Sequence, residues 1–387
     1  MVMSDCTIYQ GGRIFDGTRL HQAKALVVED GCIAGLMPET DAHVAPGQRV
    51  DLGGDILCPG FVDLQVNGGD GVMFNDAPGI DVLRRMAMAH RRLGATTILP
   101  TLITDTPAQT AAAIAAAEAA IAAGVPGIGG LHLEGPHLAV TRKGAHDPSL
   151  IRPMGPDDLA RLCDAATRLP TLLVTLAPES VTPDQVAALV KAGVVVSLGH
   201  TDADFDTCMA HVRAGATGVT HLFNAMSQMG SRAPGLVGAA LDSGALWAGL
   251  IADGVHVHPA TMGAAMAGKR GAGRIFLVSD AMAPAGTDMT EFHLNGRPIH
   301  RADGRLQLAD GTLAGADLDL TTAIGTLVHR VGVGLETALA MATSLPARFA
   351  DMPWTVGHLA QGACVPMLRL AQDQDRMRLV QVIDTDR

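Results

Sequence analysis

Residues 183–221 read PDQVAALVKAGVVVSLGHTDADFDTCMAHVRAGATGVTH, and this stretch indicates the fold of the chain. It contains two segments that begin with Pro or Asp and stop at Gly, which are signals of a helix start and a helix end. Each segment is followed by a short apolar run, and the two runs end at His200 and His221. Alternating helices and short apolar runs are typical of βα units, whose strands form a parallel sheet.

The same alternation extends along the chain on both sides of this stretch. The expected strands are 61–65, 96–101, 128–134, 172–179, 194–200, 219–221, 248–253 and 275–280, and the expected helices are 81–93, 107–123, 157–169, 183–192, 204–214 and 259–267. Eight βα units are typical of a (β/α)8 barrel. An open doubly wound sheet is the alternative, but no glycine-rich dinucleotide loop opens the first unit. We therefore expect an α/β protein with a TIM-like barrel.

The pattern changes at both ends of the chain and once within the barrel region. Residues 1–57 and 353–387 contain short β-prone runs, which glycine turns separate in the first of these segments. Residues 291–315 carry Asn-Gly and Asp-Gly pairs between further short runs, and this pattern predicts an inserted β-hairpin. Helical segments at 319–331 and 335–341 are expected to complete the barrel region.

The composition excludes several classes of protein. Hydrophobic residues make up 48% of the 387 residues, which is enough for a large core and rules out disorder. A net charge of −11 and an aromatic content of 3% argue against a nucleic-acid partner or an anionic membrane surface. No run reaches the roughly 18 apolar residues of a membrane span. The six cysteines are scattered without CxxC pairs, so we expect no disulfide framework but mostly free, buried thiols in a reducing cytoplasm.

Polar residues stand where the expected strands end. In a barrel these carboxyl ends form one rim, which is where active sites are built. The residues are Gln65, Thr101, Glu134, Glu179, His200, His221, Asp253 and Asp280. Such residues often mark only the point at which a strand leaves the core, and we favour that interpretation for Thr101 and Glu179. It accounts poorly for the acidic and histidine residues that end strands three, five, six and eight.

Glu134, His200 and His221 are expected to converge at the rim of the barrel. One carboxylate and two imidazoles leave a coordination position for water, which is the pattern of a catalytic zinc site. A single histidine is more often a hydrogen-bonded core residue, so the prediction rests on the set. Asp280 either caps a loop or acts as a general base beside a metal-bound water molecule.

Only one metal ion is expected. Barrel hydrolases with two metals commonly use a His-x-His pair at the first strand and a bridging carboxylate or carboxylated lysine. Here Gln65 and Asn67 occupy the positions of that pair, and none of the four lysines ends an expected strand. A later pair follows the seventh strand, where we interpret His256 as a substrate contact and His258 as structural.

Two loops carry cationic groups that suit an anionic substrate. Residues 224–235 combine small residues with Arg232, so backbone N–H groups and a guanidinium group are available to bind a phosphate. An ordinary surface loop is the alternative interpretation. Residues 135–146 carry a second cationic pair, Arg142 and Lys143, for which a solvated lid is the alternative.

Taken together, these segments resemble the N-acetylglucosamine-6-phosphate deacetylase family of the amidohydrolase superfamily. The resemblance is carried by PGFVDLQVNG (59–68), LPTLIT (99–104), LHLEGP (131–136), KGAH (143–146), TLAPE (175–179), GHT (199–201), THLFNAM (220–226) and VSDAMAPAG (278–286). It implies a (β/α)8 barrel over residues 58–352, with the insertion at about 291–315, and a small β-sandwich domain formed by residues 1–57 and 353–387.

The resemblance also implies a reaction, which is hydrolysis of the N-acetyl group of N-acetyl-D-glucosamine 6-phosphate to D-glucosamine 6-phosphate and acetate. The implied metal ligands are Glu134, His200 and His221, the catalytic residues are Asp280 and His146, and the substrate contacts are Gln65, Asn224, Ala225 (backbone), Arg232 and His256. The ligand set favours Zn²⁺, and Fe²⁺, Co²⁺ or Mn²⁺ would also suit it. A homodimer is implied, with Arg232 donated across the dimer as one arrangement. The N-acetylgalactosamine epimer or another N-acyl amino sugar is the alternative substrate.

The chain departs from the family at two places. Ala316 and Asp317 follow residues 312–315, where the family usually has Ser and a small residue, and residues 362–367 lack the usual pattern in the small domain. Two other interpretations stay open. A hydantoinase or deaminase is one, although the two-metal kinds need the histidine pair and lysine that are missing. A metal-free binding protein is the other, and a metal assay would separate it.

Overall fold

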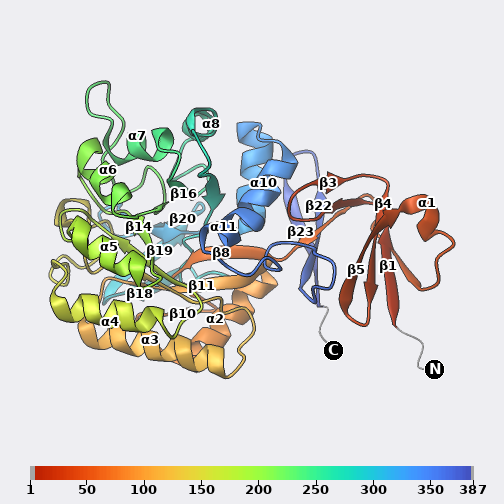
Figure 1. Cartoon of the computed structure of the whole chain (residues 1–387), viewed down its shortest axis with the longest axis horizontal. Helices are drawn as coiled ribbons and strands as arrows, with labels where there is room; N and C mark the ends of the chain where they lie inside the picture. Colours follow the sequence, from red (N-terminus) through yellow and green to blue (C-terminus); the bar gives the residue numbers. More distant parts are fainter. Residues whose placement is uncertain (1–4, 385–387) are drawn as a thin grey trace.

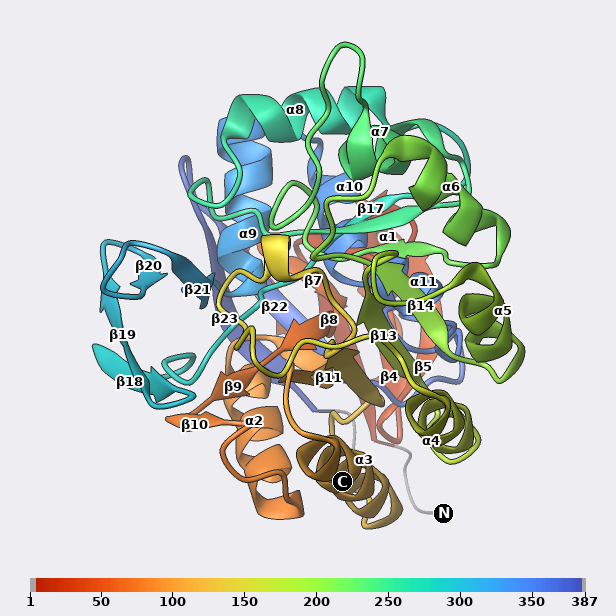
Figure 2. The ribbon, with the colours of Figure 1, turned by 90° about the vertical axis from the view of Figure 1, so that its left-hand side faces the viewer.

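The computed structural model describes residues 5–384, and its centre is an eight-stranded parallel sheet. The strands lie in the order β17 (Ile275–Leu277), β16 (Trp247–Leu250), β15 (Gly218–Val219), β14 (Val195–Leu198), β13 (Leu172–Leu176), β12 (Leu131–Glu134), β11 (Ala95–Ile103) and β8 (Phe61–Val66). Beyond β17, Ala281 forms a bridge with Val66, and the N–H group of Asp280 donates to the carbonyl oxygen of Gln65 over 3.0 Å. The sheet is therefore a nearly closed barrel, which confirms the predicted fold (Figure 2).

Helices surround the barrel, and all six helices expected between its strands are present. The helices are α2 (Ile80–Arg92), α3 (Pro107–Ala122), α4 (Pro156–Ala166), α5 (Pro183–Lys191), α6 (Phe205–Arg213), α7 (Gly235–Asp242), α8 (Pro259–Gly268), α9 (Leu320–Thr326), α10 (Leu335–Ala342) and α11 (Ser344–Phe349), with short helical turns at η1 (Val140–Arg142) and η2 (Leu327–Val331). The short helix α1 (Glu39–Ala42) lies away from the barrel, with the N-terminal strands (Figure 1). The start of α5 shows why the sequence signals work, because Thr182 and Gln185 form a reciprocal capping box. Helix α7 is not among the expected helices, and it begins at Gly235, where the expected loop of residues 224–235 ends.

Two further sheets lie beside the barrel (Figure 1), one formed by the N-terminal segment alone and the other by both ends of the chain. One has the order β5 (Cys32–Pro38), β4 (Lys24–Glu29), β1 (Cys6–Gln10), β6 (Gln48–Asp51), and the other β23 (Met377–Ile383), β22 (Met367–Gln372), β7 (Ile56–Pro59), β2 (Arg13–Phe15), β3 (Leu20–His21). Leu26 of the first sheet and Leu57 and Met367 of the second share one apolar cluster. The small β-sandwich is thus present, whereas the exact limits of the two domains stay a prediction.

A disulfide between Cys32 and Cys364 joins β5 to the segment that precedes β22. This bond corrects the expectation that the cysteines form no disulfide framework. The two residues are 332 positions apart, so their spacing carried no signal of the pairing. The other four cysteines within residues 5–384 are free, and two of them, Cys58 and Cys208, are buried as expected.

The insertion is larger than the predicted hairpin. It forms a four-stranded antiparallel sheet of β18 (Glu291–Leu294), β19 (Arg297–Ala302), β20 (Arg305–Gln307) and β21 (Leu313–Ala316), and this unit is called the inserted sheet below. Asn295 and Gly296 have φ angles of 50° and 72°, as a two-residue type I′ turn requires. Figure 2 shows the inserted sheet at one side of the barrel, beside the small hairpin of β9 (Gly68–Gly69) and β10 (Val72–Met73).

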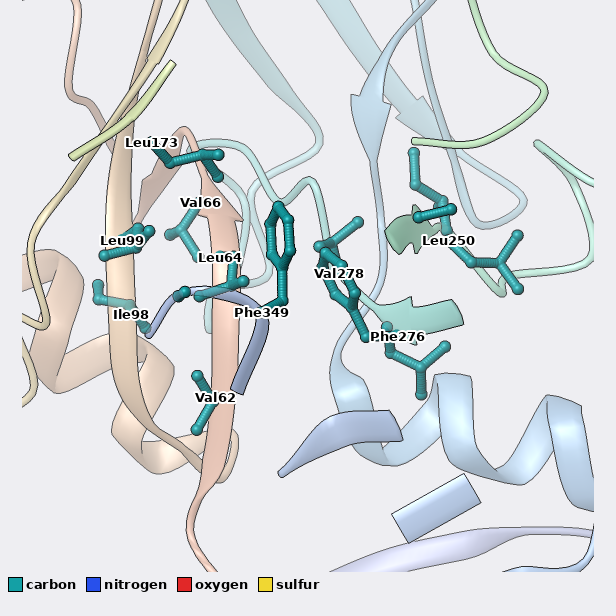
Figure 3. Packing of buried hydrophobic residues seen from close by; sticks show 14 of the residues in the cluster. Val62, Leu64, Val66, Ile98, Leu99, Leu173, Leu250, Phe276, Val278 and Phe349 are labelled. Carbon is teal, nitrogen blue, oxygen red and sulfur yellow. The ribbon is translucent and has the colours of Figure 1, made fainter. Parts of the chain in front are cut away.

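The first barrel strand shows how the sequence separates core from site. Val62, Leu64 and Val66 alternate along β8 and are buried in the apolar core that Figure 3 shows. Because successive side chains of a strand point to opposite faces, Asp63 and Gln65 lie on the other face, toward the barrel interior. No helix within residues 5–384 combines the length and the apolar character that crossing a membrane requires.

Candidate active site

Three of the predicted side chains meet at the carboxyl end of the barrel. Glu134 is the last residue of β12, and His200 and His221 follow β14 and β15. The Nε2 atoms of His200 and His221 lie 3.1 and 3.0 Å from Oε1 of Glu134, and 3.0 Å from each other. All three side chains are buried, and within residues 5–384 they are the one group with ligand atoms close enough to hold a metal ion.

The chemistry of this donor set fits a divalent cation. Nδ1 of His200 lies 2.8 Å from the carbonyl oxygen of Arg142, so it carries the ring proton, and Nε2 presents a lone pair to the cluster. Burial acts to raise the pKa of Glu134, but the interactions with the His200 and His221 imidazoles outweigh it and hold that pKa well below its usual value. An ionised carboxylate and two imidazole nitrogens facing one point are the ligands that Zn²⁺ prefers.

The backbone at the site is strained. His200, His221, Ala225 and Asp280 adopt left-handed φ angles of 48°, 33°, 48° and 52°. A residue other than glycine held in this region costs of order 1–3 kcal/mol, and such residues cluster at functional sites. Four of the predicted site residues share this property, which indicates that the loops are shaped to aim these side chains.

Asp280 lies beside the metal-binding cluster. Its Oδ1 accepts hydrogen bonds from Nδ2 of Asn67 over 2.7 Å and from Nε2 of Gln65 over 3.1 Å. Burial, together with the negative charge of Glu134, raises the pKa of Asp280 to about 7. A carboxyl group with such a pKa both accepts and releases a proton near neutral pH, as a general acid–base requires.

Gln65 connects the two carboxylates instead of facing the cavity. Its Nε2 atom lies 3.2 Å from Oε2 of Glu134 and donates to Asp280 as well. Asn67 lines the cavity in its place, and its buried Oδ1 atom has no hydrogen-bond partner among the described residues. Asn67 is therefore a better candidate for a substrate contact than Gln65, which the sequence had suggested.

His146 is held as a neutral donor. Its Nδ1 atom accepts the backbone N–H of Thr104 over 3.3 Å, which leaves the ring proton on Nε2. Burial above all, and then the nearby His200, lowers the pKa of His146 to about 3. The ring lies 4.4 Å from that of His200, between centroids, so its N–H group is available next to the metal-binding cluster.

The side chain of His256 is oriented by Asp253. Nδ1 of His256 lies 2.6 Å from Oδ2 of Asp253, and Oδ1 of Asp253 accepts the N–H groups of Val255 and His256. The sequence places Asp253 at the end of the seventh expected strand and gives no signal of this pairing. His258 accepts the N–H of Ala260 at the start of α8, which agrees with the structural role expected for it.

Eight of the ten predicted site residues line one cavity. They are Glu134, His146, His200, His221, Asn224, Ala225, His256 and Asp280. Arg232 is exposed on the loop before α7, outside this cavity. Asp317, at the departure from the family pattern, forms an ion pair with Arg301 at 2.8 Å and faces a different pocket.

Two strand-end residues have the structural roles that we favoured for them. The Glu179 carboxylate accepts hydrogen bonds from the hydroxyl group of Thr201 over 2.6 Å and from the N–H of Asp202 over 2.7 Å. The hydroxyl oxygen of Thr101 accepts the N–H of Val66 over 2.9 Å. Arg142, a candidate anion contact, is paired with Asp202 instead.

A buried polar chain below the metal-binding cluster was not predicted. His132, two residues before Glu134, lies 3.3 Å from the hydroxyl of Thr101 and 2.8 Å from that of Thr175. Thr175 continues to Thr220 at 2.6 Å, and Thr220 continues to Ser197 at 2.7 Å. The only signal in the sequence was a histidine two residues before a predicted ligand, on the same face of its strand.

The chain belongs to the amidohydrolase family, whose model matches residues 56–364. It is 42% identical over 368 residues, covering 95% of this chain and 92% of the relative, to N-acetylgalactosamine-6-phosphate deacetylase of Shewanella sp. (strain ANA-3). It is 33% identical over 342 residues, covering 87% and 88%, to N-acetylglucosamine-6-phosphate deacetylase of Haemophilus influenzae.

Two solved structures match this chain over nearly its whole length. N-acetylglucosamine-6-phosphate deacetylase from Pasteurella multocida matches with a TM-score of 0.91 and 31% identity, covering 98% of both chains. A mutant N-acetyl-D-glucosamine-6-phosphate deacetylase from Mycobacterium smegmatis, in complex with N-acetyl-D-glucosamine-6-phosphate, matches with a TM-score of 0.88 and 31% identity, covering 99% of this chain and 98% of that one. The similarity extends over both the barrel and the terminal sheets.

Proposed function

We propose that this chain hydrolyses the N-acetyl group of N-acetyl-D-glucosamine 6-phosphate and releases D-glucosamine 6-phosphate and acetate. The observation that carries the proposal is the convergence of Glu134, His200 and His221 beside a carboxyl group, Asp280, whose pKa is raised to about 7. An amide bond is hydrolysed by polarising its carbonyl group, supplying a nucleophile and protonating the leaving nitrogen, and this cavity contains groups for each task. The relatives named above support the substrate class.

One divalent metal ion is proposed at Glu134, His200 and His221. The ligand set favours Zn²⁺, and Fe²⁺, Co²⁺ or Mn²⁺ would suit the same donors. When bound, such an ion lowers the pKa of water and polarises a carbonyl oxygen. Gln65 and Asn67, as neutral amides, hold the adjacent carboxylates without adding ligands that carry a negative charge.

The residues of the chain then divide the proton transfers between them. Asp280 removes a proton from the attacking water as the new C–O bond to the acyl carbon forms. Asp280 then passes this proton to the amide nitrogen as the C–N bond breaks. His146, neutral and with its proton on Nε2, donates a hydrogen bond to the acyl oxygen as negative charge develops there. The sugar amine leaves as a neutral group instead of an anion.

The phosphate end of the substrate is proposed to lie at Asn224 and the backbone of Ala225. Arg232 is exposed outside the cavity of its own chain, so we propose that it acts on the substrate of a second copy in a homodimer. Arg232→Ala should then raise KM for the phosphorylated sugar and leave the unphosphorylated sugar unaffected. A cytoplasmic location, with no nucleic-acid or membrane partner, also stays a prediction from the sequence.

A second candidate substrate is the galacto epimer. The 42% identity to an N-acetylgalactosamine-6-phosphate deacetylase, against 33% for a glucosamine enzyme, favours this alternative. Acetate release measured side by side on the two epimeric sugar 6-phosphates and their unphosphorylated forms decides between them. A higher kcat/KM for the gluco phosphate supports the proposal, and a higher value for the galacto phosphate establishes the alternative. No acetate from any of the four would refute both.

A further inference from the structure

We propose that the inserted sheet, β18–β21, forms the acyl subsite of the cavity, and that Leu294 and Leu313 limit the N-acyl group to the size of an acetyl group. The inference rests on the proposed function and deepens it, because it names the part of the chain that selects the acyl group. It concerns a segment that lies outside the regular βα units of the barrel and that carries none of the predicted site residues.

The inserted sheet is attached to the two segments that carry Asp280 and His146. The N–H group of Ala316, the last residue of β21, donates to the carbonyl oxygen of Asp280 over 2.9 Å. The guanidinium group of Arg297, the first residue of β19, donates to the carbonyl oxygen of Ala145, which precedes His146. Because the backbone segments that carry Asp280 and His146 are bound to this sheet, we expect its cavity-facing side chains to lie next to the acyl carbonyl of the substrate.

Two leucines of the inserted sheet line the cavity. Leu294 is the last residue of β18 and is fully buried, and Leu313 is the first residue of β21 and is half-buried. Ile103 of β11 and Met282, two residues after Asp280, line the cavity with them. This side of the cavity is therefore apolar, and Ile103, Met282 and Leu294 are members of one hydrophobic cluster.

The other side of the cavity offers hydrogen-bonding groups, although Ile251 also lines it. Asn224 and Ala225 follow β15, and His256 follows β16. Sugar hydroxyls and a phosphate lose free energy when they are buried against apolar groups without hydrogen bonds, so the sugar phosphate belongs on this side. With the acyl oxygen directed to His146 and the amide nitrogen directed to the sugar, the remaining substituent of the acyl carbon faces the apolar side.

Close packing keeps the apolar wall of the cavity in place. Gly315 has a φ angle of 66°, and a Cβ atom there would collide with the Met282 side chain and the Asp280 backbone. Strand β21 therefore lies directly against the segment that carries Asp280. A longer acyl chain would have to displace Leu294 or Leu313, since the backbone behind them is already in contact.

The test compares N-acetyl, N-propionyl and N-butyryl forms of the hexosamine 6-phosphate as substrates of the full chain. One methylene in an apolar pocket changes kcat/KM by roughly 10- to 200-fold, so wild type should prefer acetyl over butyryl by about 10-fold or more. Leu313→Ala should reduce that preference by about 10-fold or more, and Leu294→Ala should act in the same direction. Leu313→Phe should increase the preference for acetyl over propionyl.

Leu308→Ala is the matched control, because it makes the same change in the insertion outside the cavity, and its acyl preference should equal that of wild type. The half-buried Leu313 carries the test if the variant of the fully buried Leu294 does not fold. The acyl subsite alone would be overturned if wild type, Leu313→Ala and Leu313→Phe all showed the same preference among the three acyl groups. A wild-type chain that released no acetate from the hexosamine phosphates would overturn both this inference and the proposed function.

Discussion

The Nε2 atoms of His200 and His221 lie 3.0 Å apart, and both residues have left-handed backbone conformations. Two imidazole nitrogens at this distance, each also about 3 Å from the same Glu134 oxygen, concentrate lone pairs at one buried point. A cation at that point would relieve the repulsion between them, whereas strain in the backbone of order 1–3 kcal/mol per residue opposes the arrangement. The proposed chemistry depends on this relationship.

His221→Ala removes one of the three donors, so the affinity for metal should fall. The loss should exceed the roughly 10- to 100-fold cost of removing an outer partner of a metal ligand. Direct titration of the metal-free chain with Zn²⁺ or Co²⁺ measures this without relying on catalysis. His258→Ala is the matched control outside the cavity, and an affinity unchanged in His221→Ala would remove this residue from the ligand set.

Asp280→Asn should lower kcat by about 10²- to 10⁴-fold, because the amide cannot accept the proton of the attacking water. Substrate affinity should change much less, since the side chain keeps its size. Steady-state kinetics on the sugar phosphate, with metal content checked in both proteins, measures the effect. Near-normal turnover would contradict the assignment of the base.

The same substitution makes a prediction about stability in the metal-free chain. The folded state raises the pKa of Asp280 from 3.8 to about 7, so it favours the protonated form. The contribution of Asp280 is fully present below pH 3.8 and is lost as the pH rises toward 7 and above. The free energy of unfolding of Asp280→Asn minus that of wild type should therefore increase from pH 5 to pH 8, by about 1 kcal/mol or more. Urea unfolding at both pH values measures it, and a constant difference would contradict the raised pKa.

Asn67→Leu should shift the pH dependence of catalysis. The hydrogen bond from Asn67 lowers the pKa of Asp280, so its removal raises that pKa further. A hydrogen bond to a charged group is worth about 1.5–3 kcal/mol, which corresponds to about 1–2 pH units. The acidic limb of the kcat/KM profile should move to higher pH by that amount. A limb that stays in place, or moves to lower pH, would exclude Asp280 as its origin.

Removing the disulfide should destabilise the terminal sheets without changing the cavity. Cys32→Ser with Cys364→Ser should lower the free energy of unfolding by about 2–4 kcal/mol. Denaturant unfolding of wild type with and without a reducing agent should show the same difference, and the double variant should not respond to the reducing agent. Two free thiols at these positions in non-reduced protein, found by mass spectrometry, would show that the bond does not form.

Much of the barrel and most of the cavity were predictable because they depend on local signals. The helix starts at Pro183 and Asp204 are short-range features, and Glu134 and the histidines follow from their places at strand ends. Relationships between distant residues were not predictable. His132 joins a polar chain across several strands, and Cys32 pairs with a residue at the other end of the chain.

The size of the inserted sheet and the position of Arg232 could not be predicted for a related reason. The turn pairs at Asn295 and Asp303 identified hairpins, but the attachment of β21 to Asp280 arises only when the barrel has formed. Arg232 lies in a segment of small residues whose path on the surface no apolar periodicity specifies.

The most direct test of the central claim is acetate release measured against bound metal. After exhaustive chelation, the full chain should release no acetate from the hexosamine 6-phosphate, and activity should return in proportion to added Zn²⁺ until one ion is bound per chain. Full activity in the chelated chain would contradict the account, as would a requirement for two ions per chain.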